Sequence, residues 1–429
     1  MDATGVLIVG AGQAGATAAA ALRGFGYAGR IVMAGAERPL PYERPPLSKA
    51  MLSGESDGTD YAVHPHGFHE EKSIGLLLGT PVTALDTAAR TATLADGSRL
   101  AYDDCLLATG GNARTVAGLP PGAPGVHYLR SMADALRLRH DLRRHRSVLI
   151  VGGGFLGLEV ASTAQALGVQ ATVLESADRV LARVVPPALS DWLQQRIAAA
   201  GVDLRLGTRC EAFALGGADG PATATLAGGG TVSADMVVVA VGLEPETALA
   251  RAAGIGLHPA NHGIRVDARC ATDTPHVYAA GDCCSQLHPF IGAELRLESW
   301  QSANEQARLA AAAIAGAATG PLAAPWFWSD QFGCNLQMLG MPVPGLTYHG
   351  RGALGEPGAA APKFLLLGAD AEGRVAHAIA VNAGGDLRQL KALIDSRTPC
   401  DLQVLCDATA PLKQQVRAAL AKTASPAIS

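Results

Sequence analysis

Two glycine-rich turns, each between a predicted buried strand and a predicted helix, constrain this chain more than any other feature. The first, Gly10-x-Gly12-x-x-Gly15, follows the apolar run Val6–Val9 and precedes an alanine-rich helix predicted at Ala16–Arg23. The second, Gly152-x-Gly154-x-x-Gly157, follows Val148–Val151. Such glycines let the backbone approach a pyrophosphate, whose charge meets the N-terminus of the helix. Because glycine turns also occur without a ligand, we rely on the repeated strand–turn–helix context, which predicts two nucleotide-binding units.

The acid that ends the strand after the second turn bears on which nicotinamide is used. Glu175 directly follows the predicted strand Ala171–Leu174. A carboxylate there accepts hydrogen bonds from the adenosine ribose and repels a 2′-phosphate, so NADH is favoured over NADPH. Arg179 and Arg183 follow closely. The alternative is that Glu175 is an ordinary acid at the end of a strand.

The first unit carries two acids in comparable places. Glu37 comes slightly after the predicted strand Arg30–Ala34, and we assign it to the ribose of the first nucleotide. Asp282 follows the short apolar strand within Thr274–Ala280, just after Gly281. A carboxylate at that point can accept from the ribityl hydroxyls of a flavin. These positions predict FAD in the first unit, although an Ala-Gly-Asp segment by itself is a common turn.

Length and composition limit the function classes. A chain of 429 residues with 48% hydrophobic and 17% charged residues predicts two or three compact domains. A formal net charge of −4 gives no electrostatic reason to expect nucleic acid as a partner. The first residues carry no basic region and no apolar run is long enough to span a bilayer, so we expect a soluble, cytoplasmic protein without a membrane partner. The eight cysteines show no C-x-x-C spacing and predict scattered thiols.

Longer motifs make the chain resemble the FAD/NAD(P)-linked pyridine nucleotide reductases. Within that family it is most similar to the ferredoxin reductase components of bacterial aromatic-ring dioxygenase systems. Besides the two glycine turns, the motifs that carry the resemblance are Leu107–Gly110, Val239–Gly242, Tyr278–Asp282, Pro41–Lys49, Glu298–Ala307 and Pro325–Gln331. The Pro-Tyr-Glu-Arg-Pro-Pro-Leu-Ser-Lys and Trp-Ser-Asp-Gln segments are far more specific than any glycine turn.

The resemblance implies an α/β fold with two Rossmann-like nucleotide-binding domains and an α+β C-terminal domain. The FAD-binding domain is discontinuous, at 1–114 and 244–322, and the NADH-binding domain is inserted at 115–243. The C-terminal interface domain is expected at 323–429, with a polar and partly disordered tail from Lys413 to Ser429.

Site residues are implied in the same way. Lys49 and Glu159 are expected to form an ion pair beside the flavin ring, and they are the candidate catalytic residues. Other positions expected to contact FAD or NADH, besides the glycines of the two turns, Glu37, Glu175 and Asp282, are Arg44, Thr109, Gly110, Arg130, Gly242, Glu298 and Trp300. The last two begin a helix predicted at Gln301–Gly316.

The implied activity is transfer of electrons from NADH through FAD to a [2Fe–2S] ferredoxin, which supplies a terminal aromatic-ring dioxygenase. FAD links the two because it accepts a hydride and releases electrons singly. No cysteine lies near residues 40–50, where disulfide reductases of this architecture carry a redox-active pair, so a dithiol relay is excluded. Rubredoxin, a P450 ferredoxin or a quinone-type molecule are alternative acceptors.

The docking residues for the ferredoxin are left open by the sequence. Trp326 and Trp328 are candidates, although tryptophans often pack domain interfaces instead. The arginines at 137–146 are better interpreted as a solvated helix face. Other basic candidates are Arg296, Arg308, Lys363, Lys391 and Arg397.

Overall fold

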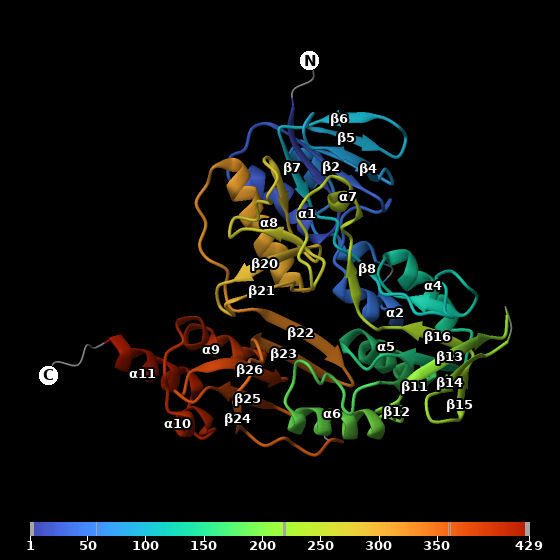
Figure 1. Cartoon of the computed structure of the whole chain (residues 1–429). Coiled ribbons are helices and arrows are strands. Elements are labelled where there is room, and N and C mark those ends of the chain that lie inside the picture. Colours follow the sequence, from blue (N-terminus) through green and yellow to red (C-terminus); the bar gives the residue numbers. More distant parts are fainter. Residues whose placement is uncertain (1–3, 57, 218–219, 359, 361, 425–429) are drawn as a thin grey trace. The chain divides into compact units, whose positions relative to one another are not determined.

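The computed structural model describes residues 4–56, 58–217, 220–358, 360 and 362–424 (Figure 1). It forms two compact units. The first comprises residues 4–46, 58–112 and 243–322, and the second comprises 47–56, 113–242 and 323–424 in its described parts. The mixed α/β class expected from the sequence is confirmed, whereas the division into three domains stays a prediction.

The first unit is built on a parallel sheet in the order β19-β7-β1-β2-β3. Its central strand β1 is buried along its whole length, as its run of valine, leucine and isoleucine predicts for a strand covered on both faces. The strands are β1 (Gly5–Val9), β2 (Arg30–Gly35), β3 (Ile74–Leu78), β7 (Asp104–Leu107) and β19 (Val277–Ala279).

Successive side chains of β1 pack into different layers. Val6 and Ile8 join a hydrophobic cluster with helices α1 (Gln13–Gly24) and α8 (Trp300–Ala315), which lie side by side. Leu7 and Val9 pack on the other side, in a cluster that includes an antiparallel layer of β4 (Val82–Asp86), β5 (Thr91–Leu94) and β6 (Arg99–Ala101). This sandwich brings the strand ends, and the loops that follow them, to one edge of the sheet.

The second unit contains a parallel sheet in the order β12-β11-β10-β16-β9. One face packs against the antiparallel strands β13 (Cys210–Leu215), β14 (Ala222–Leu226) and β15 (Thr231–Ala234). The parallel strands are β9 (Val126–Tyr128), β10 (Ser147–Val151), β11 (Gln170–Leu174), β12 (Asp203–Arg205) and β16 (Met236–Val239), and the helices are α4 (Met132–Leu142), α5 (Phe155–Ala166) and α6 (Pro187–Ala199).

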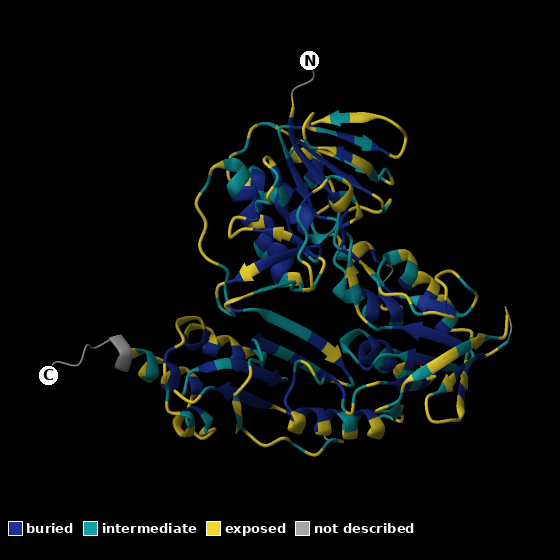
Figure 2. Ribbon diagram, in the orientation of Figure 1, coloured by how far each residue is buried: buried dark blue, intermediate teal, exposed yellow. Residues whose placement is uncertain are grey.

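The same unit includes an antiparallel sheet in the order β22-β23-β26-β25-β24, with helix α9 (Gly384–Ser396) packed on β23 and β26. Figure 2 shows its inner strands buried, whereas the first residues of β22 are only half-buried. Its other elements are β22 (Trp326–Gln331), β23 (Cys334–Gly340), β24 (Thr347–Arg351), β25 (Phe364–Ala369), β26 (Val375–Val381), α10 (Leu402–Cys406) and α11 (Leu412–Ala424).

The expectation of a partly disordered tail from Lys413 is wrong as far as Ala424, because these residues form helix α11. The guanidinium of Arg351 stabilises this end of the chain by donating to the carbonyls of Leu405, Asp407 and Ala410 and to Gln415. Residues 425–429 lie outside the described part.

Short elements complete the described chain: a 3-10 helix at Pro45–Ser48, α2 (Ala50–Ser53), a 3-10 helix at Thr59–Tyr61, α3 (Phe68–Glu71), β8 (Gly111–Ala113), β17 (Leu243–Pro245), α7 (Ala248–Ala252), β18 (Ile264–Val266), β20 (Cys284–His288) and β21 (Ala293–Leu295). None of the helices in the described ranges is long and apolar enough to cross a membrane. All eight cysteines are free, as the scattered spacing predicted.

We predict that acid destabilises the C-terminal sheet through His377. Its ring is buried at 1% exposure with Nδ1 2.7 Å from the Tyr348 hydroxyl, and burial lowers its pKa from 6.5 to about 4. The unfolded chain therefore binds a proton that the folded chain does not as the pH falls from about 6.5 to 4. The expected loss of unfolding free energy is about 3 kcal/mol over that window.

The measurement is urea unfolding at pH 7 and pH 4, followed by circular dichroism. His377→Gln keeps an acceptor for Tyr348 but does not titrate, so its unfolding free energy should fall less between the two pH values. Equal pH dependence in the two proteins would contradict the assignment to His377.

Candidate active site

The turn after β1 needs glycine at its first and third glycine positions. Gly10 has φ +117°, and a Cβ there would lie 2.1 Å from the carbonyl oxygen of Ala108. A Cβ on Gly15 would lie 2.0 Å from the carbonyl oxygen of Gly10, where the helix packs on the strand. Any side chain at either position would collide with backbone. Helix α1 begins at Gln13, three residues earlier than predicted, so its N-terminus lies directly at the turn.

The middle glycine of the same turn faces open space. Gly12 is the N-cap of α1, no side chain caps the helix there, and a Cβ would meet only the Arg44 guanidinium at 4.0 Å. A helix N-terminus with room in front of it and an arginine nearby suits a pyrophosphate, whose negative charge the N–H groups and the guanidinium would balance. The geometry therefore fits a dinucleotide.

Glu37 and Arg44 lie together beside this turn. Arg44 Nη2 is 2.8 Å from one carboxylate oxygen of Glu37, and the Tyr42 hydroxyl donates to the other at 2.5 Å. Burial alone lowers the pKa of Arg44, but Tyr42 and Glu37 together raise it above its ordinary value. The guanidinium therefore stays charged at the place where a phosphate would bind.

Two other loops of the first unit reach the same edge of the sheet. Thr109 follows β7 and donates its hydroxyl to the Glu246 carbonyl at 2.5 Å, and Gly110 has φ +69°. Asp282 follows β19, after Gly281, whose N–H donates to the Gln306 side chain of α8 at 3.0 Å. The carboxyl ends of β1, β2, β7 and β19 thus bring the predicted FAD positions of this unit to one edge.

The start of α8 is tied to the Asp282 loop by Arg296. Its guanidinium donates to the Asp282 carbonyl at 3.1 Å and pairs with Glu298 at 2.6 Å, and its side chain is only 11% exposed. Arg296 is therefore engaged by groups of its own unit, and its suggested contact with a partner protein stays a prediction. Trp300, the first residue of α8, donates its Nε1–H to Glu43 at 3.3 Å.

The thiol nearest to these positions in sequence is chemically inert. Cys283 is fully buried, and its Sγ lies 3.4–3.5 Å from the carbonyls of Leu107 and Ala280. Burial raises the pKa of this thiol, and it also raises that of Cys284. A protonated, buried thiol is a poor nucleophile, so neither cysteine is suited to a dithiol relay.

The turn after β10 repeats the arrangement of the first turn. Gly152 has φ +110°, a Cβ on Gly157 would lie 2.0 Å from the Gly152 carbonyl oxygen, and a Cβ on Gly154 would meet nothing within 4 Å. Gly154 is the N-cap of α5, again without a side-chain cap. This unit therefore also offers an open helix N-terminus to a dinucleotide.

Backbone N–H groups hold the Glu175 carboxylate beside this turn. Gly153 N donates to one oxygen at 2.7 Å and Ala177 N donates to the other at 2.8 Å. The Arg179 guanidinium donates to the Val185 carbonyl and to the Ser190 hydroxyl, both at 2.8 Å, so it is engaged within its own loop. The charge of the strand end next to the turn is therefore negative, which suits a ribose diol better than a 2′-phosphate.

Lys49 and Glu159 form an ion pair in the second unit. Lys49 Nζ is 2.9 Å from Glu159 Oε1, with side-chain exposures of 20% and 8%. The Ser48 hydroxyl donates to Oε2 at 2.5 Å and the Ser329 hydroxyl donates to Oε1 at 2.6 Å. Because these donors surround a carboxylate that is almost removed from water, its charge is balanced where it lies.

The two faces of strand β22 carry different side chains. Ser329 and Phe327 face α5, where the Phe327 ring lies 4.6 Å from the ring of Phe155. Trp326 and Trp328 alternate with them and stack on each other, with ring centroids 4.9 Å apart. The strand thus joins the Glu159 site to a half-buried aromatic pair on its opposite face.

The other predicted nucleotide contacts of this unit, Arg130 and Gly242, lie in two loops. Arg130 follows β9 and precedes the N-cap of α4, and its backbone N–H donates to Asp134. Gly242 follows β16 with φ +111°. Among the arginines at 137–146, Arg139 donates to the carbonyls of Met51 and Ser56, so the interpretation of the whole run as a solvated face is wrong for this residue.

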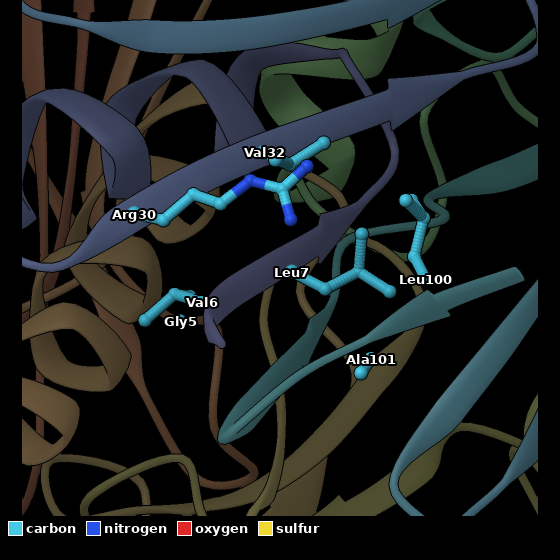
Figure 3. Close-up of a pocket in the computed structure, with 7 residues that line it drawn as sticks. All are labelled: Gly5, Val6, Leu7, Arg30, Val32, Leu100 and Ala101. Atoms are coloured by element: carbon cyan, nitrogen blue, oxygen red, sulfur yellow. The ribbon is translucent and has the colours of Figure 1, made fainter. Parts of the chain in front are cut away.

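A pocket in the first unit lies at the opposite edge of the sheet from the glycine turn (Figure 3). It is lined by the first residues of β1, by Arg30 and Val32 of β2, and by Leu100 and Ala101 of β6. Nucleotides bind at the carboxyl edge of such sheets, so this pocket is not the predicted cofactor site.

Sequence reasoning missed Ser48 and Ser329 as functional candidates. Both stand inside the specific motifs, Pro41–Lys49 and Pro325–Gln331, that carried the resemblance. Each is adjacent to a residue that was singled out, Lys49 or Trp328. The signal was therefore present, but only the structure shows that both hydroxyls reach the same carboxylate.

Comparisons with known proteins agree with this geometry. The family model described as pyridine nucleotide-disulphide oxidoreductase matches residues 4–307, and the reductase C-terminal model matches 326–416. The chain is 40% identical to the anthranilate 1,2-dioxygenase system ferredoxin–NAD(+) reductase component of Burkholderia cepacia, over 96% of this chain and 99% of that protein. It is 36% identical to the putidaredoxin reductase of Pseudomonas putida, over 98% of each.

Two solved reductase structures are also similar to this chain over nearly its whole length. The covalent complex of putidaredoxin reductase with putidaredoxin matches with a TM-score of 0.91 and 34% identity, covering 97% of this chain and 99% of that one. A ferredoxin reductase for the CYP199A2 system of Rhodopseudomonas palustris matches with a TM-score of 0.89 and 34% identity, covering 95% and 98%.

We predict that the first and middle glycines of the first turn respond differently to substitution. Gly12→Val should fold, because only Arg44 approaches its Cβ, but the added side chain occupies the space in front of α1. FAD binding should weaken about tenfold or more, by roughly 1.4 kcal/mol per tenfold. Gly10→Val should fail to fold, because it clashes with the Ala108 backbone and needs a positive φ.

The measurements are flavin content after purification and thermal unfolding. Gly154→Val is the matched control: it should keep FAD and lose affinity for NADH. A Gly12→Val protein that retains one FAD per chain at the parent affinity would rule out this placement of the pyrophosphate.

Proposed function

The chain belongs to the pyridine nucleotide-disulphide oxidoreductase family, and from that premise we propose that it carries electrons from NADH through FAD to a [2Fe–2S] ferredoxin. Each NADH gives up a hydride, and two ferredoxins each receive one electron. The ferredoxin supplies a terminal dioxygenase that acts on an aromatic ring. The enzyme is thus a ferredoxin–NAD(+) reductase, an oxidoreductase of aromatic catabolism.

The observation that carries the proposal is the presence of two open dinucleotide cradles in one chain. Gly12 and Gly154 each cap a helix without a side chain and each face space that a Cβ would enter. One nucleotide would donate a hydride and the other would receive it. FAD, when bound, accepts two electrons together and gives them up one at a time.

Each residue in the first unit has a role that follows from its place. The N-terminus of α1 and the Arg44 guanidinium would bind the pyrophosphate of FAD. Glu37 would accept from its adenosine ribose and Asp282 from its ribityl hydroxyls. We propose the loops at Thr109–Gly110 and at Glu298–Trp300 as further FAD contacts.

The second unit would hold NADH. The turn at Gly152–Gly157 would bind its pyrophosphate, and Glu175 would accept from its ribose. Lys49 and Glu159 are proposed as the ion pair beside the reacting rings, where the ammonium supplies positive charge for the incoming hydride. Arg130 and Gly242 are proposed as further nucleotide contacts.

The absence of a thiol relay supports direct export of electrons from the flavin. The segment from Glu37 to Glu55 contains no cysteine, and Cys283 is buried and protonated. Relatives named as reductase components of dioxygenase systems support a ferredoxin as the acceptor. The half-buried Trp326–Trp328 pair is a candidate for its contact, and the exposed Lys363 of the same unit is another.

Other acceptors remain distinct alternatives. Relatives also include a rubredoxin–NAD(+) reductase, a putidaredoxin reductase and a ferredoxin reductase for the CYP199A2 system, all with the same expected flavin chemistry. A small quinone-type molecule would require no protein partner. We also propose a cytoplasmic location, where NADH is available.

The experiment that tests the function is NADH-driven reduction of cytochrome c by the purified yellow protein. Adding a Rieske-type [2Fe–2S] ferredoxin should raise the rate at least about tenfold, because the ferredoxin relays single electrons. Full turnover without any ferredoxin, or none with several of them, would favour a small-molecule acceptor.

The nicotinamide preference gives a second prediction. Glu175→Arg should raise the NADPH to NADH ratio of kcat/KM by about tenfold or more, or roughly 1.4 kcal/mol, because repulsion of the 2′-phosphate becomes attraction. Steady-state kinetics with each nucleotide measures it. Asp203→Arg, on the neighbouring strand β12, is the control for added charge and should leave the ratio unchanged. An unchanged ratio in Glu175→Arg would remove the ribose assignment.

A further inference from the structure

We propose that Ser48 and Ser329 are positioning residues, which hold the Glu159 carboxylate in the orientation that fixes Lys49 for hydride transfer. The inference rests on the proposed function, because it assumes that the Lys49–Glu159 pair serves the reaction. It adds two hydroxyl groups to the machinery, neither of which was expected from the sequence.

Both oxygens of the Glu159 carboxylate are engaged from different directions. Oε2 accepts from Ser48 at 2.5 Å, and Oε1 accepts from Ser329 at 2.6 Å and pairs with Lys49 Nζ at 2.9 Å. Rotation of the carboxylate about its last torsion would break these bonds together. Hydrogen bonds to a charged acceptor are stronger than neutral ones, so the two serines lock its plane.

The carboxylate and its donors come from three separate segments. Ser48 and Lys49 precede α2, Glu159 lies on α5, and Ser329 lies on β22. Ser48 and Ser329 are buried, at 3% and 0% exposure, so water does not replace their hydroxyls. Each hydroxyl therefore donates to the Glu159 carboxylate from a position that solvent barely reaches.

The Ser329 hydroxyl has a defined direction. Gln331 Nε2 donates to its oxygen at 3.1 Å, and the hydroxyl donates to Glu159. A hydroxyl carries one proton, so an incoming bond from the amide directs that proton toward the carboxylate. The hydrogen bonds from Gln331 to Ser329 and from Ser329 to Glu159 therefore run in one direction and hold the carboxylate in a defined orientation.

The need for such support follows from the chemistry of lysine. An ammonium on a four-carbon stem is a flexible point charge, so its position depends on its partner. If the carboxylate turned, Lys49 would move with it, and a misplacement of about 1 Å in a reacting site costs up to roughly 100-fold in rate. The serines act through Glu159 and do not need to touch a nucleotide.

A competing explanation for the two serines is that their hydroxyls only hold neighbouring segments of the chain together. Neighbouring bonds already do this: the Thr163 hydroxyl donates to the Ser48 carbonyl at 2.9 Å, and the Ser162 hydroxyl accepts from Phe332 N at 2.7 Å. Ser162 therefore provides a matched control. It lies on the same helix and contacts the chain just after β22, but it does not bond to Glu159.

The experiment compares Ser48→Ala, Ser329→Ala and Ser162→Ala in the FAD-containing protein, each alone and combined with Glu159→Gln. Stopped-flow spectroscopy measures the limiting rate of flavin reduction by NADH. Titration with NAD⁺ measures its dissociation constant, and urea unfolding gives the midpoint for each protein. Ser329→Cys, which keeps a similar volume with a weaker donor, replaces Ser329→Ala if that variant does not fold.

We expect each of the two serine variants to slow flavin reduction about tenfold, the loss expected for one bond to a charged group. The NAD⁺ dissociation constant should change less than about twofold, because the glycine turn and Glu175 determine it. In the Glu159→Gln background the same substitutions should have less than about a twofold effect, since residues that act as a unit are not additive. Unfolding midpoints should show the same coupling between Ser329 and Glu159.

Two outcomes for the serine variants would overturn the inference. One is that Ser48→Ala and Ser329→Ala slow reduction no more than Ser162→Ala. The other is that their effect persists in full in the Glu159→Gln background. If Glu159→Gln itself leaves flavin reduction unchanged, both the serine inference and the proposed role of the ion pair fail, whereas the ferredoxin assay separately tests the function of the whole enzyme.

Discussion

The buried carboxylate of Glu159 is the constraint on which the arrangement of the second unit depends. An ionised carboxylate at 8% side-chain exposure is tolerable only if its oxygens are paired. Helix α5 cannot supply these partners itself, so they come from the segment before α2 and from β22. The nucleotide-binding sheet, the segment at 47–56 and the C-terminal sheet therefore meet around one charge. The segment that carries Lys49 groups with this unit, to which it is also joined by bonds from Arg139 of α4.

The two glycine turns share one backbone solution, which we propose serves two nucleotides. In both, the outer glycines prevent collisions with backbone and the middle glycine leaves space before a helix. The acidic residues beside the two turns are held in place by different kinds of hydrogen-bond donor. Glu175 is held by backbone N–H groups next to its turn, whereas Glu37 is held by the Arg44 and Tyr42 side chains. The later position of Glu37 in the sequence fits this difference, because side chains rather than the turn itself define where its carboxylate lies.

The thiol beside the proposed FAD contacts is unreactive, which supports the proposal that electrons leave directly from the flavin. Cys283 follows Asp282 directly, but burial keeps its thiol protonated. In place of a reactive thiol, the chain has the Pro-Tyr-Glu-Arg-Pro-Pro-Leu-Ser-Lys segment, which contributes an arginine, a serine and a lysine. Charge and hydrogen bonding thus replace covalent chemistry, as expected of a protein whose cofactor does the redox work.

The sequence by itself determined the features that depend on neighbouring residues. The strands at β1 and β10, the glycine turns and the acid after β11 follow from local periodicity and from the backbone freedom of glycine, and all appear where they were predicted. The tertiary structure alone decided the serine partners of Glu159, which lie 111 and 170 positions away, and the bond from Arg296 to the Asp282 carbonyl. It also decided that residues 412–424 form a helix, whose polar sequence is stabilised by contacts from Arg351. Contacts between distant segments leave no periodic signal, because a serine that meets a buried carboxylate looks in the sequence like any other serine.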